Sequence, residues 1–308
     1  MNNAFTIDVE DYFQVAAFAD KISISAWDNH ESRVERNTAF LLEMLDLRGI
    51  KGTFFVLGWI AKRYPQLVRD IAAQGHEIAS HGMNHQLIYN QEPAVFREET
   101  RSSKRLLEDL CGSPVIGYRA ATYSITNRSR WALDTLVEEG YLYDSSIFPM
   151  RHDKYGIPGA TPHPHHLVTV KGNTIAEFPI SVLQFGKLTL PVAGGGYFRL
   201  FPYAVTRWAL KKLNARKQAF VFYLHPWEID PKQPKIRDAG IFSKFRHYQN
   251  LGRCRARLEM LLDDFTFRPL RTVLAEIGLL HVDAAGSWSA LLPSNEKPVH
   301  AGVLERDG

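Results

Sequence analysis

Two histidines spaced four residues apart are the first candidates for chemistry in this chain. His81 and His85 follow a short apolar stretch within Gly75–His85. Four residues are just over one helical turn, so both imidazoles project from one face wherever the turn is even partly helical. Histidine pairs at this spacing bind zinc in other proteins, although such a pair also fits a solvated turn. A hydrolytic metal site further needs a carboxylate from elsewhere and an open position for water.

Three acids near the N-terminus can supply that carboxylate. Asp8, Glu10 and Asp11 come at the end of an expected strand with alternating apolar residues. Carboxylates this close together repel one another and lose hydration when buried, unless a cation offsets both costs. One of them could instead cap a following helix, but capping needs only one acid. The cluster therefore indicates a cation site.

The composition sets broad bounds on fold and function. The 308 residues are 45% apolar and 23% charged, which is typical of globular proteins with one large or two smaller domains. The net charge of +4 is small and the Lys and Arg residues are scattered, which argues against nucleic-acid binding. Cys111 and Cys254 lie far apart, so a disulfide scaffold is not expected. We see no signal-peptide pattern and no apolar run of about 18 residues, so we expect a cytoplasmic protein without a transmembrane segment.

Stretches typical of strands alternate with stretches typical of amphipathic helices. Helices are expected over 31–47, 59–74, 93–110, 130–139 and 203–213, and strands over 52–58, 115–118, 141–143, 175–180 and 219–224. Such units with buried strands predict a parallel α/β sheet or barrel. The composition changes after residue 230. We expect a barrel over 1–230, a short helical appendage packed on it over 231–285, and a flexible tail over 286–308.

Five polar residues fall just past the C-terminal ends of expected strands, and they are Asp8, His81, Arg119, Asp144 and His225. In a parallel barrel these ends gather on one rim, where active sites are built. Each residue alone has an ordinary explanation as a cap, a surface residue or a core histidine. Five together are difficult to explain in that way, so we expect a functional site on this rim.

Five short segments share their order and spacing with a known family, and they are Thr6–Asp11, Ser80–His85, Gly117–Ala121, Tyr143–Ser146 and Leu224–Glu228. The chain resembles the polysaccharide deacetylases of the NodB-homology type, carbohydrate esterase family 4. More narrowly, it resembles the branch found in bacterial exopolysaccharide gene clusters, whose members have an extra C-terminal region. The resemblance implies a distorted, incomplete (β/α) barrel and metal-dependent removal of acetyl groups from N-acetylated sugars.

The resemblance also implies catalytic roles. Asp8 would be the general base that takes a proton from water at the metal, and Arg119 would hold its carboxylate in place. His225 would be the general acid that protonates the leaving amine, with Asp144 as a candidate for orienting it. A backbone N–H near Thr122 would stabilise the oxyanion, although the loop differs from the family pattern because Ala follows the Arg-x pair where Pro is usual.

The metal ligands follow from the resemblance except for the third one. His81 and His85 would hold one divalent ion, with Zn²⁺ favoured over other first-row divalent ions. The family usually has two adjacent aspartates, but here Val9 follows the first. The third ligand is therefore Glu10 or Asp11. Glu10 is slightly preferred because it lies two residues after the proposed base, on the same face of the strand.

Aromatic and glycine residues later in the chain are candidates for a substrate groove. Tyr197, Phe198 and Trp227 could present flat faces to sugar rings, or could equally be core aromatics. The Pro/His-rich stretch 158–166 is better explained as an irregular surface loop than as a second metal site.

Three functions are compatible with these features. The first is a metal-dependent N-deacetylase of an amino-sugar-containing exopolysaccharide or its precursor, working with exopolysaccharide assembly proteins. The second is an amide hydrolase of the same fold that acts on a small ureide-like molecule. The third is a non-catalytic glycan-binding barrel, which an intact set of base, ligands, arginine and acid argues against.

Overall fold

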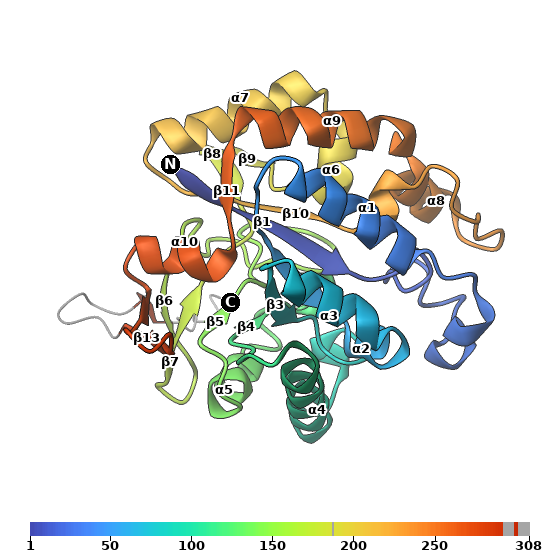
Figure 1. The fold of residues 1–308 in the computed structure, drawn as a ribbon. Coiled ribbons are helices and arrows are strands. Elements are labelled where there is room, and N and C mark those ends of the chain that lie inside the picture. Colours follow the sequence, from blue (N-terminus) through green and yellow to red (C-terminus); the bar gives the residue numbers. More distant parts are fainter. Residues whose placement is uncertain (187, 292–298, 301–308) are drawn as a thin grey trace, which may run out of the picture.

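A curled, mostly parallel sheet forms the centre of the molecule (Figure 1). The computed structural model describes residues 1–308 except 187, 292–298 and 301–308. The main sheet has the strand order β10-β1-β2-β3-β4-β5-β7-β6-β14, and β11 also pairs with β1. All its pairings are parallel except that of β6 with β7. The sheet curls into an incomplete barrel with helices outside it, which confirms the expected fold.

The strands are short, apart from the first. Those of the main sheet are β1 Asn2–Val9, β2 Thr53–Val56, β3 Glu77–Ser80, β4 Gly117–Tyr118, β5 Tyr143–Asp144, β6 His165–Val168, β7 Thr174–Glu177, β10 Val221–Leu224, β11 Thr266–Arg268 and β14 Val299–His300. Two small antiparallel pairs lie outside it, formed by β8 Val182–Phe185 with β9 Leu188–Pro191 and by β12 Leu280–Val282 with β13 Trp288–Ala290.

Ten α-helices occur in the described residues, and they are α1 Val34–Asp46, α2 Gly58–Arg63, α3 Pro65–Ala73, α4 Pro93–Cys111, α5 Trp131–Glu138, α6 Gly195–Leu200, α7 Tyr203–Ala215, α8 Ile241–Tyr248, α9 Leu251–Asp264 and α10 Leu270–Glu276. Four short 3₁₀ turns complete the set: η1 Ile24–Asn29, η2 Ile88–Asn90, η3 Ala121–Tyr123 and η4 Pro226–Ile229. The single helix expected over 59–74 is two helices. Pro65 disfavours helical backbone at Tyr64, whose ψ is 63°, and starts α3 instead.

The register of the sheet brings the site residues to one rim. Val56 of β2 is level with Val9 on one side and with Ser80 on the other, and Ser80 is level with Tyr118. The residues that follow these positions are Glu10, His81 and Arg119. Because the strands are parallel, these side chains emerge at the same edge of the sheet.

The segment expected as an appendage does more than pack on the barrel. β11 pairs with the start of β1, so that Asn2 lies opposite Thr266. The buried ring of Phe267 lies 5.4 Å from that of Phe5 and 5.9 Å from that of Phe220. The helix α9 adds further residues to the same hydrophobic core. Most of the expected tail lies outside the described residues, but β13 falls within its first part.

Phe267→Ala should therefore destabilise the whole protein. Removing a fully buried Phe side chain typically lowers the free energy of unfolding by about 3–5 kcal/mol. Phe242→Ala is the matched control, because Phe242 is 84% exposed and its loss should change stability by at most about 0.5 kcal/mol. Urea denaturation of both variants measures the difference. Equal stabilities would show that 231–285 is not part of the barrel core.

Among the described residues, no helix is both long enough and apolar enough to cross a membrane.

Candidate metal and catalytic site

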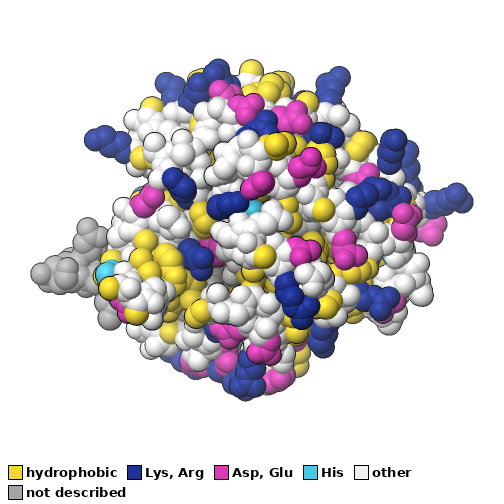
Figure 2. Space-filling view, in the orientation of Figure 1, with side chains coloured by type: hydrophobic (Ala, Val, Ile, Leu, Met, Phe, Trp, Pro, Cys, Tyr) yellow, Lys and Arg dark blue, Asp and Glu magenta, His cyan; other side chains and the backbone are white. Residues whose placement is uncertain are grey.

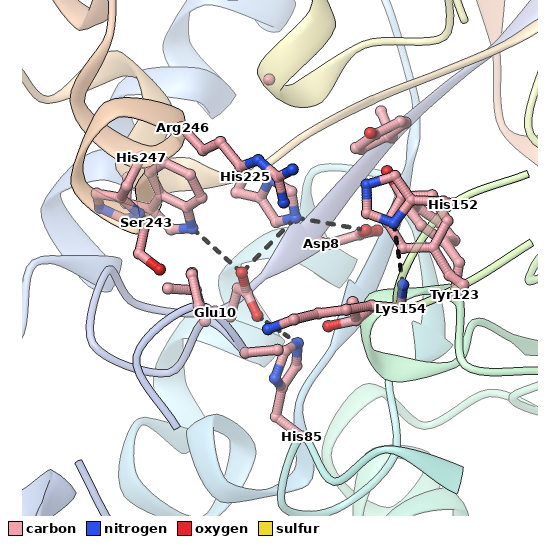
Figure 3. Close-up of a pocket in the computed structure, with 18 of the residues that line it drawn as sticks. Asp8, Glu10, His85, Tyr123, His152, Lys154, His225, Ser243, Arg246 and His247 are labelled. Atoms are coloured by element: carbon pink, nitrogen blue, oxygen red, sulfur yellow. Dashed lines mark hydrogen bonds and ion pairs between the residues drawn. The ribbon is translucent and has the colours of Figure 1, made fainter. Parts of the chain in front are cut away.

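A cavity of about 520 Å³ opens at the rim where the parallel strands end (Figure 3). Most of the residues expected at the site line it, and they are Asp8, Glu10, His81, His85, Thr122, His225 and Trp227. Segments that follow the barrel strands form its outer wall, including Tyr155 and the α8 residues Phe242 and Arg246. The cavity thus combines acids and imidazoles at its base with aromatic and basic side chains at its mouth.

Glu10, His81 and His85 form a group suited to a metal ion. One potential ligand atom from each lies within 4.8 Å of the other two. His85 Nε2 is 2.7 Å from Glu10 Oε2, yet in the described part of the structure Glu10 Oε2 has no hydrogen-bond partner. A buried carboxylate oxygen beside two imidazoles, with one ligand atom of each residue near a common point, fits a divalent first-row cation such as zinc.

The backbone and second partners orient the two imidazoles. His81 follows β3 directly, and its Nδ1 lies 2.8 Å from the backbone oxygen of Arg119. An Nδ1–H donated to this oxygen leaves Nε2 as the ligand atom. Burial lowers the pKa of His81 to about 4, which keeps the ring neutral, as a ligand must be. His85 has a φ of 53°, a left-handed conformation that is uncommon for residues other than glycine and that clusters at functional sites.

Asp11, the alternative third ligand, is occupied elsewhere. Its Oδ2 accepts hydrogen bonds from the backbone N–H of Arg33 at 2.7 Å and of Val34 at 3.1 Å, and from the Ser32 hydroxyl at 2.8 Å. Asp11 thereby satisfies free N–H groups at the start of α1. Asp11 therefore caps α1, and Glu10 is the carboxylate that lies beside the histidines.

Asp8 lies where a general base is expected, and Arg119 fixes it there. The Arg119 Nη1 donates to Asp8 Oδ1 at 2.6 Å and to the Thr6 hydroxyl at 2.8 Å. The rest of the guanidinium donates to Ser145, and its plane lies over the Phe55 ring at 4.0 Å. A fully buried arginine held on all sides places one carboxylate oxygen rigidly and leaves the other, Oδ2, facing His225.

His225 lies across from the metal group, and Glu228 orients it. Its Nε2 is 3.6 Å from Glu10 Oε1 and 3.9 Å from Asp8 Oδ2, while its Nδ1 is 2.7 Å from Glu228 Oε1. Burial disfavours the imidazolium, but the charge of Glu10, the hydrogen bond and charge of Glu228 and the charge of Asp8 outweigh it. Together they raise the pKa of His225 to about 9. These carboxylates favour the protonated ring, which is suited to donate a proton.

Asp144 does not orient His225, contrary to our expectation. Its carboxylate accepts hydrogen bonds from the hydroxyl of Ser146 at 2.6 Å and from its backbone N–H at 3.1 Å. It also shares a hydrogen bond with Glu177 of β7, whose pKa is raised well above its usual value by burial and by the negative charge of Asp144. Asp144 therefore stabilises the loop after β5, on which Ser145 contacts Arg119.

Sequence reasoning missed Glu228 and Arg199. Arg199 of α6 is buried, and its Nε donates to Glu228 Oε2 at 2.6 Å. Its remaining N–H groups bond backbone oxygens of 246–249, at the end of α8. A signal for Glu228 was available, because it ends the matched segment Leu224–Glu228, three residues after His225. The position of Arg199 has no such signal.

Two of the three aromatic candidates for sugar binding have other roles. Trp227 is 5% exposed, and its Nε1–H donates to Glu10 Oε1 at 3.2 Å. Its ring stacks between those of His225 and His247, at 5.2 and 4.1 Å. Trp227 therefore supports the metal group instead of offering a free face. Phe198 is a core residue with 1% exposure, and its ring packs on Phe222 at 4.9 Å.

Other aromatic residues form the mouth. Tyr197 lies beside the cavity wall, where it is hydrogen-bonded to Tyr155. The ring of His152 stacks on Tyr155 at 3.7 Å, and Phe242 projects from α8 with 84% exposure. The sequence indicated only an irregular loop around 151–166. Thr122 lines the cavity as expected, with a φ of 52°.

Glu228→Gln should lower kcat for hydrolysis of an N-acetylated sugar by about 10- to 100-fold, because it removes the charge that stabilises the protonated His225. Metal content should not change. The matched comparison is Asp144→Asn, which should keep kcat within about threefold since Asp144 does not contact His225. Steady-state kinetics on the folded variants distinguish the two acids. A larger kcat loss for Asp144→Asn would restore it as the orienting residue.

Comparison with known proteins agrees with this geometry. Residues 18–137 match the family model "Polysaccharide deacetylase". This match covers 120 of the 308 residues. Residues 145–275 match a second model, a domain of unknown function named DUF3473, which runs across residue 230 into the expected appendage.

Proteins named as deacetylases are similar to the chain over limited lengths. A chitooligosaccharide deacetylase of Bradyrhizobium sp. is 31% identical over 99 residues, or 32% of this chain and 43% of that protein. A peptidoglycan-N-acetylglucosamine deacetylase of Bacillus cereus is 29% identical over 79 residues, or 26% and 37% of the two chains. The chain thus spans less than half the length of these relatives.

Solved structures show the same fold over most of the chain. A protein of Mycobacterium smegmatis assigned to the polysaccharide deacetylases superposes with a TM-score of 0.57 and 22% identity, over 96% of this chain and 94% of the other. Puue allantoinase gives a TM-score of 0.55 and 14% identity, over 86% and 85%. At these identities the likeness concerns the fold alone, because one fold hosts different chemistries.

Proposed function

We propose that this protein is a metal-dependent N-deacetylase that hydrolyses the acetamide of an amino-sugar-containing exopolysaccharide or its precursor. The observation that carries the proposal is the placement of Asp8 and His225 around the group Glu10, His81 and His85, in one cavity. A glycan-binding module would need no buried base, acid and ligand set. The names of the relatives support an N-acetylated glycan as substrate.

The residues divide the reaction between two sides of the cavity. A divalent ion held by Glu10, His81 and His85 supplies the Lewis-acid chemistry that activates water at neutral pH and polarises a carbonyl. Asp8, fixed by Arg119, accepts the proton that the attacking water loses.

On the opposite side, proton donation completes the cleavage of the C–N bond. His225, held by Glu228, donates a proton to the departing amine, which leaves poorly unless it is protonated. Thr122 lines the cavity, and its backbone N–H is the proposed donor to the oxyanion.

Acetate release from N-acetylglucosamine oligomers tests the proposal. We expect release by the protein with one equivalent of Zn²⁺, and a loss of at least about 100-fold after chelation that metal addition reverses. Allantoin is the comparison substrate, because the fold is shared with an allantoinase. Turnover of allantoin without acetate release from any N-acetylated sugar would contradict the proposal in favour of a ureide hydrolase.

A further inference from the structure

The segment 231–250 carries an unusual charge. It contains five basic residues, Lys232, Lys235, Arg237, Lys244 and Arg246, and only one acid, Asp238. The excess of four positive charges equals the net charge of the entire chain. Figure 2 shows Lys and Arg side chains gathered at the right of the molecule, where Figure 1 places α8. The formal charges of the remaining residues sum to zero, although the stretch 207–217 is also basic, with five Lys or Arg residues and no acid.

Apolar side chains project from the same segment. Ile241 and Phe242 are each 84% exposed and Phe245 is 60% exposed, all on α8. His247 is the only residue of this helix that is buried. Large apolar residues exposed side by side on one short helix are uncommon on a surface that contacts only water, and they indicate an interaction site.

A hollow of about 740 Å³ lies beside α8, between the helix and the chain that leads to it. Three cationic residues line it, Lys235, Arg237 and Lys244, and none of its lining residues is an acid. Within the described residues these three cations form no ion pair, although Lys244 Nζ donates to the backbone oxygen of Arg237. The other lining residues are mainly apolar or aromatic, and they are Leu200, Ile236, Phe245, Tyr248, Gln249 and Asn250.

We propose that this region, which we call the α8 surface (Lys235, Arg237, Ile241, Lys244 and Phe245), docks on an anionic lipid bilayer. Unpaired cations around exposed apolar side chains complement the two layers of a membrane interface, the phosphates and the boundary of the acyl chains. Ile241 projects almost fully into solvent at the start of the helix. A projecting apolar tip inserts readily into lipid, whereas a protein partner would have to supply a matching pocket.

Docking in this way would hold the catalytic cavity next to the membrane. Phe242, Ser243 and Arg246 line the cavity from one side of α8, and Lys244 and Phe245 line the hollow from the other. The helix is thus a wall shared by both. If the proposed deacetylase function holds, the enzyme acts on glycan at the bilayer surface, but the docking itself does not depend on that function.

Co-sedimentation of the full chain with vesicles tests the docking without any assay of activity. We expect binding to vesicles of about 70% phosphatidylcholine and 30% phosphatidylglycerol, and little binding to phosphatidylcholine alone. About 0.5 M NaCl should release most of the protein. Lys235→Gln with Arg237→Gln should lower the partition coefficient by about 10- to 30-fold. Ile241→Ser with Phe245→Ser should lower it by at least about tenfold.

The matched control variants change residues that are far from the α8 surface in the sequence and similarly exposed. Leu47→Ser with Leu188→Ser removes two apolar side chains that are 79% and 65% exposed, and Lys212→Gln with Lys217→Gln removes two exposed charges. Both controls should bind as the parent does. Equal binding to the two vesicle types, or equal losses in the controls, would overturn the proposal. The proposal would also be overturned if the parent protein were a dimer that Ile241→Ser with Phe245→Ser dissociates, and if neither the parent nor any variant bound vesicles. The surface would then be an interface between two copies.

Discussion

Asp8→Asn should abolish turnover while the protein still binds its metal. Asparagine has no carboxylate to accept the proton of the attacking water, and loss of a general base typically costs about 10²- to 10⁴-fold in kcat. The side-chain oxygen of Asn can still accept the hydrogen bond from Arg119, so the geometry around it should persist. Asp8 is not one of the three residues that converge on the metal position. We therefore expect an inactive protein with one equivalent of zinc.

Two measurements on the same preparation check this result. Acetate release gives kcat, and elemental analysis after gel filtration gives the metal content. Asp153→Asn is the control, because Asp153 is an exposed acid at the mouth of the same cavity, and its kcat should stay within about twofold of the parent. Near-normal turnover of metal-loaded Asp8→Asn would exclude Asp8 as the base.

His81→Ala should lose the metal itself. The change leaves one imidazole and one carboxylate, which is too few protein ligands for a catalytic zinc site. It also removes the ring that is fixed by the backbone oxygen of Arg119. We expect at least about a 100-fold weaker metal affinity, and turnover below about 1% of the parent, since even second-shell changes cost 10- to 100-fold.

Thermal unfolding with and without zinc reports metal binding independently of catalysis. A ligand present at about 100 times its Kd stabilises the native state by about 2.7 kcal/mol, so zinc should raise the Tm of the parent but not of His81→Ala. His163→Ala is the control, because His163 is an exposed histidine of the Pro/His-rich loop. A zinc-induced rise in Tm that persists in His81→Ala and disappears in His163→Ala would place the metal in that loop.

The sequence predicted the rim of the barrel well because its evidence there was local. Asp8 is the residue before the last one of β1, and His81 and Arg119 directly follow β3 and β4. Parallel strands bring such positions together. The same reasoning failed for Asp144. It ends the strand β5, but its carboxylate is hydrogen-bonded to Ser146 and Glu177 and does not contact His225. The acid that contacts an imidazole is decided by side-chain conformation and by competing hydrogen bonds. The position of a residue at the end of a strand does not determine either.

The sequence also could not predict the pairing of strands that lie far apart in the chain. β11 is only three residues long, and no local periodicity distinguishes it from a loop. It becomes a strand because it lies along β1, more than 250 residues away in the sequence. For a related reason the sequence left Trp227 open between a sugar platform and a core aromatic. Its flat ring suggested a sugar platform, but His247 from the C-terminal segment covers one face and His225 covers the other.

The position of β1 between distant partners has a consequence for biosynthesis. β1 leaves the ribosome before the other described strands, but it pairs with β10 and β11, which are made more than 200 residues later. At roughly 5–20 residues per second, the first strand waits on the order of ten seconds or more for those neighbours. Glu10, His81 and His85 all emerge early, whereas His225, Glu228 and Arg199 come late. We expect a nascent chain to contain the proposed metal ligands well before it contains the proton donor, so hydrolysis has to wait until residues 199–228 have been made.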